Sequence, residues 1–241
     1  MKYYQAKNEI SSYKYILFLF LNAVAIIFGI ILQFLIPKDQ NWLGKKSLIT
    51  GIPLLRTWYL SIPFIFSIVI FIYYISFFYL NKDCNDHYNN IFTYLKRLGG
   101  FRLFTNLAIF ALFYIIYYKL VHPINKAYKF KLSGHVTATL TSGTMLFNIW
   151  SVSENMYKFH IGKRSVNLAF YYICGFILIH NTYSIIFTAW IYHHIRESVM
   201  AFIITSFYLY IVNFMKVDNI VLLAIYPELP EDNDDNFISK D

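Results

Sequence analysis

The chain has 241 residues, of which 58% are hydrophobic and 21% aromatic, whereas only 14% carry a charge. A soluble domain carries roughly 25% charged residues, so the composition excludes an ordinary soluble domain and favours a membrane protein. The net charge of +8 does not indicate a nucleic-acid partner, because Lys and Arg lie at the ends of apolar segments. There they act as topology signals and as contacts for membrane lipids.

Six segments are long and apolar enough to be considered as membrane spans. In chain order they cover residues 15–36, 58–80, 103–118, 133–152, 168–192 and 198–215. The first is too long for the core of a cleavable signal, so it counts as a span. We therefore predict an all-α integral membrane protein, a bundle of about six transmembrane helices in a single domain over residues 1–226. The acidic stretch 227–241 is predicted to be a disordered tail.

Polar residues inside the spans indicate contacts between helices. Asn22 and Gln33 in the first span are expected to hydrogen-bond to neighbouring helices, because an unpaired amide in hydrocarbon costs several kcal/mol. The fourth span is unusually rich in Ser, Thr and Asn, which predicts a place inside the bundle or along a cavity. His180, next to Asn181 in the middle of the fifth span, is a functional candidate by its position, but thirteen helical residues separate it from His193 by about 20 Å, so it is interpreted as an interhelical hydrogen-bonding residue.

Two short motifs stand at span ends. Ser133, Gly134 and His135 open the fourth span, and His193 precedes Glu197 by four residues in the link between the fifth and sixth spans. With six spans, both motifs lie on the same side of the membrane, whichever way the bundle is oriented. The two histidines are therefore expected to meet.

This pair of motifs is typical of phosphoryl transfer. His193 is the predicted nucleophile, Glu197 would orient and polarise its imidazole, and His135 would protonate the leaving group. A separation of about 5 to 8 Å between the imidazoles would leave room for one phosphate. No cofactor is required, and no metal is expected, since the two cysteines lack zinc-ligand spacing.

Substrate contacts are predicted around the first motif. A helix N-terminus is a natural phosphate site, and Gly134 would let the backbone approach closely. Basic residues near the two motifs would neutralise the phosphate. The predicted substrate-binding residues are Ser133, Gly134, Lys131, Lys129 and Arg196.

Each motif alone has a plainer explanation. A Ser-Gly-His triplet occurs often by chance, and a histidine near a membrane interface is commonly an amphipathic anchor. His194 is interpreted as such a neighbour and not as a second catalyst. The two motifs together, on one side of the membrane, favour an enzyme.

With these motifs, the chain resembles the fat storage-inducing transmembrane family, within the superfamily of type 2 phosphatidic acid phosphatases and sphingomyelin synthases. The resemblance covers most of the chain: the six spans, the triplet at 133–135 and the stretch 189–199. It implies an acyl-CoA diphosphatase with His193 and His135 as catalytic residues, acting in the endoplasmic reticulum and linked to lipid-droplet formation. The mitochondrial inner membrane remains open as a second compartment.

The chain departs from this family at two positions. Lys131 stands where the family usually has an acidic residue, and Ala201 where it usually has Gly. These departures keep a second hypothesis open: a catalytically inactive structural or lipid-binding subunit of a larger membrane complex, with protein partners. The substrate under the first hypothesis is acyl-CoA or another lipid phosphate.

Overall fold

The computed structural model describes residues 12–36, 61–81, 90–98, 102–121, 123, 132–158 and 163–214. These residues are almost entirely helical, with no strand among them. The all-helical class predicted from the sequence is therefore confirmed for this part of the chain. The tail at 227–241 lies outside the described residues.

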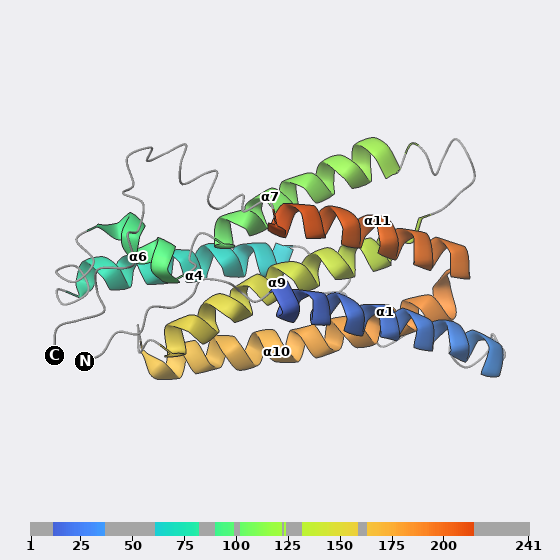
Figure 1. Ribbon diagram of the computed structural model, residues 1–241, viewed down its shortest axis with the longest axis horizontal. Coiled ribbons are helices and arrows are strands. Elements are labelled where there is room, and N and C mark those ends of the chain that lie inside the picture. Colours follow the sequence, from blue (N-terminus) through green and yellow to red (C-terminus); the bar gives the residue numbers. More distant parts are fainter. Residues whose placement is uncertain are drawn as a thin grey trace.

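The helices form an elongated bundle (Figure 1). The long elements are α1 (Ser12–Leu35), α4 (Ser61–Leu80), α7 (Arg102–Tyr114), α9 (Gly134–Lys158), α10 (Arg164–Phe187) and α11 (Ile195–Phe214). A short helix, α6 (Ile91–Leu98), precedes α7. Two π-helical segments extend α7 and α10: η1 (Ile115–Val121) and η2 (Thr188–Tyr192).

Each of the six segments predicted to span contains a helix among its described residues, but these helices differ in apolarity. Among the described residues, four helices are long and apolar enough to cross a membrane: Lys14–Leu35, Ser61–Leu80, Arg164–Tyr192 and Ile195–Asn213. This indicates a membrane protein. The apolar helix Arg102–Tyr117 is shorter than these, and α9 carries too many polar residues to belong with them. The number of crossings therefore stays a prediction.

α9 forms the centre of the bundle. It runs between the other helices in Figure 1 and packs against α4, α6, α7, α10 and α11. Every residue from 139 to 149 is buried. Its N-terminal half packs against α1, α7, α10 and α11, and its C-terminal half against α4, α6 and the start of α10. The prediction that the fourth span lies inside the bundle is thus confirmed.

The buried polar groups of α9 find partners on the surrounding helices. Thr141 shares a hydrogen bond with Tyr208 of α11 at 2.7 Å. The Asn148 amide donates to the side-chain oxygen of Asn106 on α7 at 2.9 Å and to that of Asn213 on α11 at 3.3 Å. Such bonds remove the cost of burying polar atoms among apolar neighbours and fix how the helices pair.

The sequence predicted interhelical hydrogen bonds for three polar residues: Asn22, Gln33 and His180. Gln33 contacts another segment, because its amide donates to the carbonyl oxygens of Ala189 in η2 and of His193. Asn22 does not, because its amide donates to the carbonyl oxygen of Phe18 in its own helix, 2.8 Å away. Next to His180 on α10, Asn181 makes an interhelical bond, to Ser142 of α9 at 3.3 Å.

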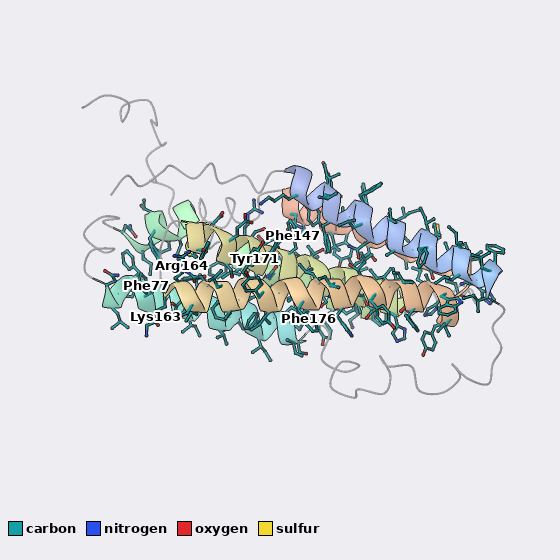
Figure 2. All side chains as sticks on the ribbon, turned by 90° about the horizontal axis from the view of Figure 1, so that it is seen from below. Phe77, Phe147, Lys163, Arg164, Tyr171 and Phe176 are labelled. Atoms are coloured by element: carbon teal, nitrogen blue, oxygen red, sulfur yellow. The ribbon has the colours of Figure 1, made fainter. Side chains whose placement is uncertain are left out.

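The outer surface of the described bundle is strongly apolar. Phe176 of α10, labelled in Figure 2, is 73% exposed, and many large aliphatic and aromatic side chains of α1, α4 and α11 are also exposed. Exposed apolar area on this scale is expected where the surrounding medium is lipid. The polar groups are gathered inside, around α9.

Candidate functional site

The first motif begins a helix. Ser133 precedes α9, and its side-chain oxygen accepts a hydrogen bond from the backbone N–H of Val136 at 3.2 Å. This is the N-cap arrangement that Ser favours, because it satisfies a backbone donor that has no partner within the helix. Ser133 has no exposed surface. We had predicted it as a phosphate ligand, but its hydroxyl instead holds the start of α9.

The second motif begins another helix. Glu197 lies in the first turn of α11, and its Oε2 atom accepts a hydrogen bond from the backbone N–H of His194 at 3.3 Å. A glutamate at this position often caps a helix in this way. The same oxygen lies 3.1 Å from Nδ1 of His193. The carboxylate therefore holds the backbone and the imidazole together.

This contact determines which nitrogen of His193 is available. An ionised carboxylate only accepts hydrogen bonds, so Nδ1 carries a proton and donates a hydrogen bond to Glu197. In the neutral form of the imidazole, Nε2 then carries the lone pair. The side chain of His193 is 19% exposed and that of Glu197 is 12% exposed, so the pair is largely shielded while the ring still reaches the surface.

His135 lies beside this pair. Its ring centroid is 5.9 Å from that of His193, with the ring planes at 50°. The ring of His135 also lies 6.3 Å from that of Tyr192, with the ring planes at 21°. His135 and Tyr192 are both exposed. The two histidines, far apart in sequence, therefore meet at one end of the bundle, at the separation expected for a phosphate site.

Direct hydrogen bonds join the two helix starts. The backbone N–H of Ser133 donates to the carbonyl oxygen of Glu197 at 3.3 Å. One turn further along α9, the side-chain oxygen of Thr137 accepts a hydrogen bond from the hydroxyl of Thr205 on α11 at 3.2 Å. The Thr137 hydroxyl itself donates to the carbonyl oxygen of Ser133. These contacts fix His135 relative to His193. They also place two helix N-termini, each with positive dipole character, side by side.

A π-helical turn leads into His193. η2 ends at Tyr192, and the backbone of His193 is extended, with φ −127° and ψ 152°. The chain therefore leaves the helix abruptly just where the histidine must be held. π-helical turns are rare and frequently occur at functional sites.

The remaining predicted site residues fall into two groups. Lys129 and Lys131 lie outside the described residues. Arg196 is exposed on the first turn of α11, and Gly134 is the first residue of α9. At Gly134 the space that a Cβ would occupy is filled by Tyr117 of η1, whose hydroxyl would be 2.5 Å away. The group that comes close to the backbone at Gly134 is therefore the phenol ring of Tyr117.

Two features of the site were not predicted from the sequence. Tyr192, whose ring lies beside that of His135, was not among the predicted site residues. Gln33 was expected to contact another helix, but not the residues that hold His193. For Gln33, the available signal in the sequence was a polar residue near the end of an otherwise apolar helix. That signal does not indicate which residues the side chain contacts.

Comparison with family models, with curated proteins and with solved structures gives no match for this chain. The functional argument therefore rests on the geometry of the site itself.

Proposed function

We propose that the chain is an integral membrane hydrolase that cleaves a lipid phosphate or diphosphate. One observation carries the proposal: His193 is bound through Nδ1 to Glu197, and its ring lies 5.9 Å from that of His135. One imidazole is thereby prepared as a nucleophile, and a second stands close enough to act on the other side of a phosphorus atom.

In the first step, Nε2 of His193 attacks phosphorus, and the bond from phosphorus to the leaving oxygen breaks. His135, protonated, gives its proton to that oxygen. The proton on Nδ1 stays with His193, and the Glu197 carboxylate stabilises the positive charge that the ring gains. The products of this step are the released alcohol or phosphate ester and a phosphorus–nitrogen bond on His193.

In the second step, water attacks the phosphorus atom from the side that the leaving group vacated. His135, now neutral, removes a proton from the water, and the phosphorus–nitrogen bond breaks. His193 recovers its lone pair and His135 its proton. The cycle consumes one water molecule and needs no oxidant, metal or cofactor.

The apolar exterior supports a lipid-linked substrate, since its chain would lie among lipids while the phosphate reaches the helix starts. The resemblance to the fat storage-inducing transmembrane family makes the diphosphate of acyl-CoA the leading substrate. By the same resemblance we propose the endoplasmic reticulum as its compartment and a role in lipid-droplet formation. We extend the bundle to six transmembrane helices on the same basis.

The test is hydrolysis by the purified protein in lipid nanodiscs. Oleoyl-CoA should yield oleoyl-phosphopantetheine, measured by mass spectrometry, and phosphatidic acid serves as the second substrate. His193→Ala should abolish turnover, whereas His194→Ala, which changes the exposed neighbour, should leave it close to wild type. Equal turnover by wild type and His193→Ala would remove the mechanism.

A structural or lipid-binding subunit is the second candidate. The observation that favours it is that Ser133 and Glu197 both cap helices, a task that needs no chemistry. This candidate predicts no hydrolysis of either substrate and copurification in a stoichiometric membrane complex.

A further inference from the structure

The side-chain amide of Gln33 on α1 contacts the backbone at two places: at Ala189 in η2 and at His193, where the second motif begins. Its Nε2 atom donates to the carbonyl oxygen of Ala189 in η2 and, at 3.0 Å, to that of His193. A carboxamide nitrogen has two hydrogens, so these two bonds use its full donor capacity. One side chain thus connects the π-helical turn to the residue that follows it.

Both carbonyl groups need a partner from outside their own helix. The last carbonyl oxygens of a helix have no donor within it. Here the chain becomes extended at His193, so no further helical turn follows that could provide donors. A carbonyl group without a hydrogen-bond donor is unfavourable wherever water cannot reach it. Gln33 therefore acts as a C-terminal cap supplied by a different helix.

The packing of α1 on η2 fixes where this amide lies. Gly29, one turn before Gln33, sits so close to the neighbouring chain that an added Cβ would be 2.6 Å from the carbonyl oxygen of Ile186 and 2.8 Å from Cβ of Ala189. Residues four apart share one face of a helix. Gly29 lets the backbones approach, and Gln33 then reaches the carbonyl groups.

We propose that Gln33 is a positioning residue for His193. The inference rests on the proposed function, because it assigns Gln33 the task of holding the nucleophile in line with phosphorus. Glu197 controls the rotation of the imidazole through Nδ1, while Gln33 controls the backbone that carries the ring. A displacement of about 1 Å at a reacting atom can cost on the order of a hundredfold in rate.

The chain offers a matched control on the same helix. Asn22 is another side-chain amide of α1; it is buried and donates to the carbonyl oxygen of Phe18 within its own helix. We compare Gln33→Met, which keeps the length of the side chain and loses both donors, with Asn22→Leu. Gln33→Met should lower kcat by about tenfold to a hundredfold with KM within about twofold, since substrate binding is retained. Asn22→Leu should change neither constant by more than about twofold.

A second measurement does not depend on activity. Hydrogen–deuterium exchange of peptides covering 188–194 should become faster in Gln33→Met, because the end of η2 loses its cap, and should be unchanged in Asn22→Leu. If these peptides exchange in Gln33→Met at the same rate as in the wild type, the proposal is overturned, whether or not a substrate is found. Wild-type kcat in Gln33→Met, while His193→Ala is inactive, would overturn it and leave the proposed hydrolase intact.

Discussion

The backbone N–H of Ser133 donates to the carbonyl oxygen of Glu197, 3.3 Å away. The residue that caps α9 is therefore bonded to the residue that caps α11 and holds His193. Because the bond lies between main-chain atoms, it fixes the distance between the two histidines independently of their side chains.

Glu197→Gln should lower kcat/KM by about a hundredfold or more, because a neutral amide neither stabilises the charged imidazole nor fixes the proton on Nδ1. The substituted side chain still has an oxygen that can accept the N–H of His194, so the helix cap survives. Glu154→Gln is the control, since Glu154 pairs with Lys14 at 3.1 Å near the other end of α9. Comparable losses in both variants would assign the effect to the fold and not to the site.

His135→Gln should affect substrates according to their leaving groups. An alkyl phosphate such as phosphatidic acid releases a strongly basic oxygen and needs the acid, so its rate should fall by about a hundredfold or more. A nitrophenyl ester of the same lipid phosphate releases a weakly basic oxygen and should lose far less. The ratio of the two rates is the measurement, and an equal loss for both esters would contradict the role of His135 as the acid.

Gly29→Ala should destabilise the protein, because its Cβ would overlap the backbone oxygen of Ile186. Overpacking of this kind typically costs about 1–3 kcal/mol. Gly175→Ala, in the middle of α10, is the matched substitution: no atom lies within 4 Å of the added Cβ, and alanine favours a helix by about 1 kcal/mol over glycine. Thermal unfolding in one detergent should therefore give a lower Tm for the first variant and an unchanged or higher Tm for the second.

Ser133→Ala removes the side-chain cap of α9 and should lower the stability by about 1 kcal/mol. Ser133→Thr keeps a capping hydroxyl and should recover most of that loss. Both variants should keep the KM of the wild type, because the hydroxyl is fully buried against the helix backbone. A KM raised severalfold in Ser133→Ala, with Tm unchanged, would instead support direct contact with substrate.

The sequence predicted the positions of the long helices well, because runs of apolar residues and their polar interruptions are local signals. It also predicted that His135 and His193 converge, through the argument that both motifs lie on one side of the membrane. The double task of Glu197 was only half predicted: its spacing from His193 indicated the imidazole contact, but the cap on His194 depends on where α11 begins.

Contacts between helices were harder to predict, because hydropathy does not specify which faces meet. Asn22 and Gln33 look alike in the sequence, yet only Gln33 reaches another helix. The phenol of Tyr117 beside Gly134 and the ring of Tyr192 beside His135 depend on the π-helical ends of α7 and α10. Those local changes of helix geometry had no recognisable pattern in the sequence.

The burial of α9 has a consequence for how the protein is made. A helix with this many hydroxyl and amide side chains gains little by entering hydrocarbon alone, whereas α10, the next helix to be synthesised, is apolar on its outer face. Under the six-span prediction, insertion of α9 therefore depends on partners that share its hydrogen bonds, supplied by α1 and α7 before it and by α10 and α11 after it. A substitution that removes one of these partners should therefore lower the amount of folded protein that the cell produces, even where the activity per molecule is unchanged.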